Sequence, residues 1–324
     1  MKNFNIEKNR TTEFKLDKNT TNLIKFLACL LIAFAHYSGY AIVNGLEPLF
    51  IYKFIAAFGG YVGVALFFFF SGYGLMKSEQ RKDAIKFAGF LTKRLRRTYL
   101  PAVLVSALWL GIAYFVDLDL LCNKNYISGV FLSFNDEVMW FVSVILIMYL
   151  FFFTYRYISL KNVFKKTIFK VVLLSITTLV GYCFIRYLFD AYCASNVPFF
   201  FIGIVVAEFN RYFKLFISSF IVVILLVLLL GAVMYLYRAD NFVLHGCINY
   251  LVVTFMLFIF SNYNIQINML PHWIGDCSYD VYLVHYKVHL LNISLFSVNT
   301  IWMFIVCTVV STFLFNIIRK LFRV

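Results

Sequence analysis

The chain has 324 residues, of which 63% are hydrophobic and 14% are charged, and its formal net charge is +14. A soluble globular domain is close to half apolar, so this composition excludes an ordinary water-soluble protein. The positive charge does not indicate nucleic-acid binding, because the basic residues gather in alternate loops between long apolar runs. That arrangement is typical of an integral membrane protein.

Apolar runs follow one another along the whole chain. A membrane-spanning helix needs about 20 apolar residues, and lipid favours helices because a helix satisfies its own backbone groups. The sequence therefore predicts an all-α polytopic membrane protein with about ten transmembrane helices. The expected spans lie at about 22–43, 54–76, 98–117, 138–156, 168–189, 197–210, 215–237, 242–260, 273–297 and 299–318.

Charge predicts the orientation. Lys and Arg gather before the first run, at 77–97, around 156–170, at 211–214 and at the C-terminal end. By the positive-inside rule both termini are cytoplasmic, which requires an even number of spans. We expect a cytoplasmic N-terminal tail at 1–21, one transmembrane domain at 22–318 and a cytoplasmic C-terminal tail at 319–324. No signal peptide is expected, because about twenty mostly polar residues precede the first run and no cleavage site follows it.

The first run contains two ionisable residues, Lys25 and His36. Eleven residues of helix turn through about 1100°, close to three full turns, and rise about 16 Å, so both side chains lie on one stripe. An ionisable group at the depth of His36 is costly and by default faces a cavity. Burial disfavours the charged imidazolium, and a neutral imidazole is a suitable general base. The alternative is that His36 only bonds a neighbouring helix.

Further motifs follow in chain order. They are ALFFFFSGYGL (65–75), FLTKRLRRTYLP (90–101), MWFVSVILIMYL (139–150), FFFIGIVVA (199–207) and IGDCSYDVYLVH (274–285). Together with the Lys25–His36 spacing, this series resembles the acyltransferase family 3 membrane proteins, which acylate cell-surface glycans. Two features depart from the family: Lys25 replaces the commoner Arg, and Val144–Ile145 stand where many members have Glu. Lys lacks the planar fork of Arg, so the first departure alters anion geometry.

The resemblance implies transfer of an acyl group, usually acetyl, from cytoplasmic acyl-CoA to a sugar hydroxyl. Acyl-CoA is then a cosubstrate and no permanently bound cofactor is expected. In this interpretation His36 is the general base, and Lys25 is a second catalytic residue on the same route. Direct attack on the thioester is favoured over a covalent acyl-imidazole.

Lys93, Arg94 and Arg97 are suitable ligands for the phosphates of coenzyme A, since Arg binds phosphate bidentately. The alternative is that these residues only set the topology. Candidate substrate contacts are Trp140, Ser71, Tyr282 and His285. Ser71 is a candidate oxyanion donor, as are Lys25 and the backbone at Gly72. Trp140 is equally typical of an interfacial anchor, and Gly72 and Gly74 of close packing.

The ninth expected span carries a polar face. Ser278, Tyr282, His285 and His289 recur at i, i+4, i+7 and i+11, so the helix is too polar to face lipid throughout. This face is compatible with bonding between helices, with a cavity wall or with a proton relay. The spacing of His285 and His289 does not by itself indicate a metal site, and none is expected.

Two other classes of function stay open. A proton-coupled transporter or exporter of a polysaccharide intermediate would use the same buried polar residues. A non-catalytic sensor or assembly subunit would leave the Lys25–His36 spacing accidental. The expected partners are acyl-CoA, a glycan or lipid-linked sugar, and membrane lipids, and the family suggests a bacterial inner membrane. The acceptor, the acyl group and the oligomeric state are not encoded in these patterns.

Overall fold

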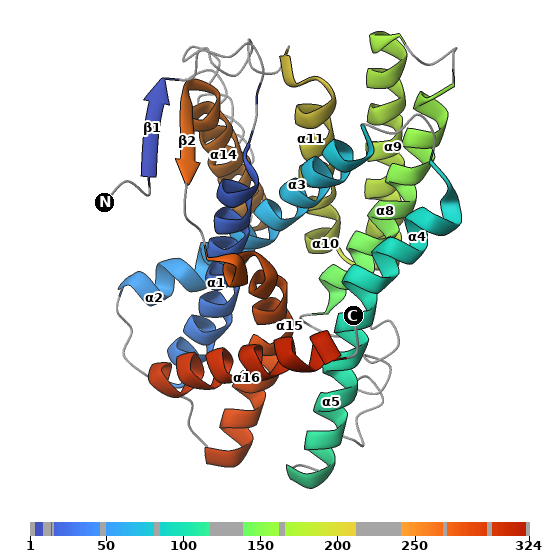
Figure 1. Cartoon of the computed structure of the whole chain (residues 1–324). Coiled ribbons are helices and arrows are strands. Elements are labelled where there is room, and N and C mark those ends of the chain that lie inside the picture. Colours follow the sequence, from blue (N-terminus) through green and yellow to red (C-terminus); the bar gives the residue numbers. More distant parts are fainter. Residues whose placement is uncertain are drawn as a thin grey trace. The chain divides into compact units, whose positions relative to one another are not determined.

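The computed structural model describes residues 4–8, 14, 16–45, 50–80, 85–116, 139–161, 166–211, 241–267, 271–296 and 300–321. These residues are mainly helical (Figure 1). The helices are α1 (Lys18–Val43), α2 (Phe50–Phe54), α3 (Gly60–Glu79), α4 (Phe87–Arg94), α5 (Leu100–Val116), α8 (Trp140–Ser159), α9 (Thr167–Leu188), α10 (Ala191–Ser195), α11 (Val197–Glu208), α14 (Asn241–Asn262), α15 (His272–Phe296) and α16 (Ile301–Leu321). Two π-helical turns, η1 (Ile55–Gly59) and η2 (Leu95–Tyr99), connect α2 to α3 and α4 to α5.

Six stretches of the described chain are long and apolar enough to cross a membrane. They are Lys18–Val43, Phe50–Glu79, Trp140–Ser159, Thr167–Leu188, Ala191–Glu208 and Ile301–Leu321. The third, eighth and ninth expected spans also fall on helices, namely α5, α14 and α15. The seventh expected span, 215–237, lies outside the described residues. The structure thus supports a multi-pass helical membrane protein, while the count of ten and the orientation stay predictions.

The described residues form two parts. The first contains 1–80 and 199–278, and the second contains 81–198 and 279–324. The first part holds α1 to α3, α14 and most of α11. The second holds α4, α5, α8 to α10, α16 and most of α15.

The N-terminal segment packs against the first part. Strand β1 (Phe4–Lys8) pairs antiparallel with β2 (Tyr263–Ile267), a sheet that the sequence patterns did not indicate. Phe14 is fully buried and packs edge-on against Tyr73. Helix α1 then begins at Lys18, where the Asp17 carboxylate accepts the Thr20 N–H at 3.0 Å, as an N-cap does. The helix therefore starts before the expected boundary at residue 22.

Glycines let α1 and α3 approach closely. A Cβ at Gly63 would lie only 2.6 Å from the Ala28 carbonyl oxygen and 2.6 Å from Ile32 Cγ1. One turn earlier, a Cβ at Gly59 would lie 3.2 Å from the Leu31 carbonyl oxygen. Small residues four apart bring helix backbones together in this way inside membranes, where the hydrophobic effect does not drive helix association.

Helices α3 and α11 meet through a reciprocal pair of glycines. A Cβ on Gly72 would collide with the Phe200 carbonyl, and a Cβ on Gly203 would collide with the Phe69 carbonyl. Gly72 is therefore a close-packing residue, as one of the two sequence interpretations proposed. Gly74, by contrast, has open space where its Cβ would be.

Candidate active site

Lys25 and His36 share one face of α1 with two buried residues. Positions 25, 29, 32 and 36 recur at i, i+4, i+7 and i+11 in a helix that is uninterrupted from Lys18 to Val43. Cys29 and Ile32, between them, are 0% and 2% exposed, whereas Lys25 and His36 are half-buried. Because Ile32 contacts α3 at Gly63, this face points toward the packed side of α1.

The glycine contacts define which levels of α3 lie beside the two residues. Gly63 lies opposite Ala28 and Ile32, and Gly59, one turn earlier, lies opposite Leu31 and Ala35. The helices are therefore antiparallel, and facing residue numbers sum to about 93. His36 is then level with about residue 57, inside the π-helical turn η1. Such turns interrupt the regular ladder and are frequent at functional sites.

Ser71 lies far from His36 in this register. It is level with about residue 22 of α1, about 21 Å along the helix from His36 at 1.5 Å per residue. It is much closer to the level of Lys25. Ser71 therefore does not qualify as a donor to an oxyanion beside His36.

Two other candidate oxyanion donors also fail on geometry. Gly72 lies inside the continuous helix α3, where its N–H belongs to the helical hydrogen-bond ladder. Lys25 lies about 16 Å from His36 along α1, and helical side chains tilt toward the N-terminus, so Lys25 points away from His36. Lys25 is therefore not placed to donate to an oxyanion beside His36.

In the second part, the predicted phosphate ligands lie where α4 passes into η2. Lys93 and Arg97 are exposed, and so is Arg96, which was not singled out from the sequence. The Leu100 N–H bonds to the Leu95 carbonyl, five residues back, which is the register of a π-helical turn. This end of the helix therefore presents three exposed cations beside one another.

Arg94 differs from its neighbours. Its guanidinium lies 5.4 Å from the centre of the Phe90 ring and 5.6 Å from that of Tyr149. Such cation–π contacts contribute about 0.5–1 kcal/mol each at exposed sites and more when desolvated. Arg94 therefore connects α4 to α8. The exposed cations of this cluster are its neighbours Lys93, Arg96 and Arg97.

An aromatic row joins three predicted substrate contacts of the second part. The Trp140 ring lies 5.2 Å from that of Tyr192, and its neighbour Phe141 lies 5.4 Å from Tyr282. The Tyr282 ring in turn lies 5.9 Å from that of His285. Trp140, Tyr282 and His285 thus belong to one continuous cluster, although the first comes from α8 and the others from α15.

His285 has a defined tautomer. It is fully buried, and its Nδ1 lies 2.7 Å from the Tyr282 carbonyl oxygen. A carbonyl only accepts hydrogen bonds, so the neutral ring must carry its proton on Nδ1. Nε2 is then the nitrogen with the lone pair, which suits an acceptor role.

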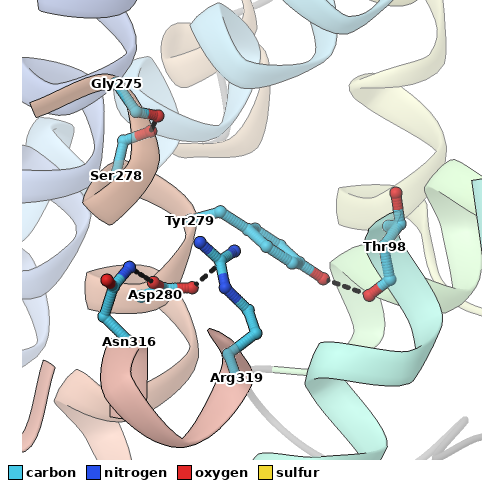
Figure 2. A network of polar contacts seen from close by, with 7 residues as sticks. All are labelled: Thr98, Gly275, Ser278, Tyr279, Asp280, Asn316 and Arg319. Carbon is cyan, nitrogen blue, oxygen red and sulfur yellow. Dashed lines mark hydrogen bonds and ion pairs between the residues drawn. The ribbon is translucent and has the colours of Figure 1, made fainter. Parts of the chain in front are cut away.

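The most developed polar network was not identified from the sequence (Figure 2). Asp280 of α15 is fully buried, and its carboxylate lies 3.0 Å from Nη1 of Arg319 and 2.8 Å from the amide nitrogen of Asn316. Both partners come from α16, which continues to Leu321. Arg319 therefore lies within the last helix, and the cytoplasmic location of this end stays a prediction. The available signal was the three-residue spacing of Asn316 and Arg319, which places both on one face.

Helix α15 is buried on opposite sides, in agreement with the prediction that it does not face lipid throughout. Its buried polar residues include Asp280, His285, Lys287, His289 and Asn292, all at most 6% exposed. Within the described residues, no group of three or more His, Cys, Asp or Glu side chains is placed to hold a metal ion.

Comparison with known proteins identifies the family. The family model described as an acyltransferase domain, that of acyltransferase family 3, matches residues 19–319. No curated protein and no solved structure matches the chain significantly. The match covers nearly the whole sequence and includes every motif described above. The chain therefore belongs to acyltransferase family 3.

Proposed function

We propose that this membrane acyltransferase moves an acyl group, acetyl in the first instance, from cytoplasmic acyl-CoA to a hydroxyl of a cell-surface or lipid-linked glycan. The observation that carries the proposal is the face of α1 that holds Lys25 and His36 on either side of Cys29 and Ile32. In a family of acyltransferases, a histidine at that depth has a direct chemical use.

His36 is the general base of this scheme. Its neutral imidazole accepts the proton of the acceptor hydroxyl while the hydroxyl oxygen attacks the thioester carbonyl carbon. Collapse of the tetrahedral intermediate breaks the carbon–sulfur bond, and the departing thiolate of CoA receives the proton. A route through a covalent acyl-imidazole gives the same products. Trapping of an acylated His36 would distinguish that route from direct transfer.

In this scheme Lys25 helps to bind acyl-CoA and does not act on the reacting carbonyl carbon. Because it lies about 16 Å from His36 along the same face, it lines the route of the long pantetheine arm. A single ammonium there attracts the anionic donor without the two-point geometry that an Arg would impose. This is the chemical consequence of Lys at a position where the family more often has Arg.

The phosphates of CoA are assigned to the exposed cations of η2 and its neighbour Lys93. Arg97 and Arg96 offer planar forks that bind phosphate bidentately. Arg94 contributes through packing, because its guanidinium lies against Phe90 and Tyr149. Acyl-CoA is a cosubstrate in this proposal, and the scheme uses no resident cofactor.

The sugar is assigned to the aromatic row of Trp140, Tyr282 and His285. Aromatic faces offer apolar area to the C–H face of a sugar, and hydroxyl and imidazole groups bond its hydroxyls. The row is held together by the ring contacts of Phe141 and Tyr192. The multi-pass helices and this substrate class support our proposal that the enzyme works in a bacterial inner membrane.

The test is acyl transfer by the purified full-length protein in lipid nanodiscs. Isotope-labelled acetyl-CoA is supplied with candidate glycans, and the label is followed into the glycan by mass spectrometry. Label in an ester-linked glycan, together with release of one CoA per ester, supports the proposal. Transport of a glycan across proteoliposomes with no consumption of acyl-CoA would instead support the transporter.

A further inference from the structure

We infer that Tyr279 is a positioning residue for the acyl-CoA phosphate site: its hydroxyl holds η2 in the register that presents Arg96 and Arg97. The inference rests on the proposed function, because it concerns the cations to which that function assigns the phosphates. It adds a residue and a mechanism that neither the family match nor the sequence motifs assign.

The register of η2 is unusual and has a local cause. The Leu100 N–H reaches the carbonyl of Leu95, five residues back, instead of that of the residue four back. Pro101 follows directly, lacks an N–H and sterically opposes an α-helical turn around the carbonyl of Arg97. The wider turn accommodates this proline, but a π-helical turn is intrinsically less favourable than an α-helical one and persists when other contacts support it.

Tyr279 supplies such a contact (Figure 2). Its hydroxyl donates to the carbonyl oxygen of Thr98, inside η2, at 2.7 Å. The two residues are 181 positions apart in the chain, so this is a tertiary contact and not part of the helix itself. Because the acceptor is a backbone carbonyl, the bond constrains the path of the turn.

Tyr279 is itself held in place on α15. Its ring is stacked on that of Tyr282, with centres 6.2 Å apart. The next residue, Asp280, is fixed by its ion pair with Arg319 and its hydrogen bond from Asn316. Tyr279 therefore acts as a rigid support for η2, and η2 is the segment free to change register.

A change of register would move the cations. A π-helical turn contains one more residue than an α-helical turn, and each residue corresponds to about 100° of rotation. Relaxation of η2 to an α-helical turn would therefore rotate the helix before it by about 100° in total relative to the helix that follows, and Arg96 and Arg97, inside the turn, would undergo part of that rotation. Arg94 precedes η2 and is held by two rings, so it would stay in place.

The experiment compares Tyr279→Phe with Tyr286→Phe in the full-length protein in nanodiscs. Tyr286 lies on the same helix and contacts the His289 ring, so its variant is a matched loss of one hydroxyl. Binding of CoA is measured by calorimetry, and the thermal midpoint and the KM for the glycan are measured in parallel. Tyr279→Phe should raise the Kd for CoA about fivefold, which corresponds to about 1 kcal/mol for one hydrogen bond. The glycan KM should not change, the thermal midpoint should fall by at most about 2 °C for the loss of one intramolecular hydrogen bond, and Tyr286→Phe should match wild type.

Pro101→Ala supplies the missing N–H and lets η2 wind as an α-helix, so it should also weaken CoA binding. If both variants act through the same register, adding Tyr279→Phe to Pro101→Ala should have little further effect. Simple additivity, an unchanged Kd in Tyr279→Phe, or equal losses of CoA binding, glycan binding and stability would each overturn the inference. A wild type that binds no CoA would overturn the proposed function as well, which distinguishes the two failures.

Discussion

The ion pair between Asp280 and Arg319 makes a quantitative prediction about stability. Asp280 is 0% exposed and Arg319 is 17% exposed, so the pair lies in a low-dielectric setting. Removing one partner of a buried pair typically costs about 3–5 kcal/mol, because the other charge stays behind uncompensated. A carboxyl group can relieve part of that cost by taking up a proton. We therefore expect Arg319→Met to destabilise the protein by about 3 kcal/mol.

The pair can be dissected with a double-mutant cycle. In Asp280→Leu/Arg319→Met neither charge of the pair is left. The Asn316 amide then lacks its acceptor, which should lower the free energy of unfolding by about 1 kcal/mol. The double variant should therefore be more stable than Arg319→Met alone. Lys320→Met, which removes an exposed charge one position along the same helix, is the control and should change stability by less than about 0.5 kcal/mol.

The assay is thermal unfolding in detergent micelles, followed by tryptophan fluorescence at one scan rate, because irreversible unfolding makes the midpoint depend on that rate. A loss of about 3 kcal/mol should lower the midpoint by about 4 °C in a chain of this size. A midpoint for Arg319→Met equal to that of wild type would refute the reasoning. So would a double variant less stable than either single variant.

Two further predictions concern packing and binding. Gly72→Ala should lower the thermal midpoint, because overpacking against the Phe200 carbonyl costs about 1–3 kcal/mol. Gly74→Ala meets open space and should be neutral. Equal midpoints for the two variants would contradict the contact between α3 and α11. Arg97→Ala should weaken CoA binding about tenfold with little change in the thermal midpoint. Arg94→Ala should lower the thermal midpoint, because its contacts with the Phe90 and Tyr149 rings are lost. Calorimetry and thermal unfolding together separate these roles, and the reverse pattern would contradict them.

The helical segments were predictable because a bilayer imposes a length and an apolar composition on each span. The shared face of Lys25 and His36 was also predictable, since helical periodicity decides it without knowledge of any neighbour. Ser71 shows the limit of this reasoning. Its proximity to His36 depends on the direction and register of α3 against α1, and the contacts of Gly63 place it about 21 Å away along the helix.

Features that depend on a partner from elsewhere in the chain were not predictable. The terminal basic cluster predicts that Arg319 lies on the cytoplasmic side, but it does not indicate that its guanidinium pairs with Asp280 on another helix. The turn η2 is a one-residue change of hydrogen-bond register, to which Pro101 is the only local clue. The pairing of β1 with β2 joins segments about 260 residues apart, and neither segment carries a hairpin signal.

The most direct test of the central claim is turnover of acetyl-CoA by purified wild type and His36→Ala, with thermal stabilisation by acetyl-CoA measured on the same samples. A general base contributes about 10²–10⁴-fold to the rate, so His36→Ala should release CoA at least about 100-fold more slowly in the presence of a glycan acceptor. Stabilisation by acetyl-CoA should be retained, because the proposal assigns the phosphates to Lys93 and η2 and not to His36. Undiminished turnover in His36→Ala, or a folded wild type that no acyl-CoA stabilises, would contradict the account.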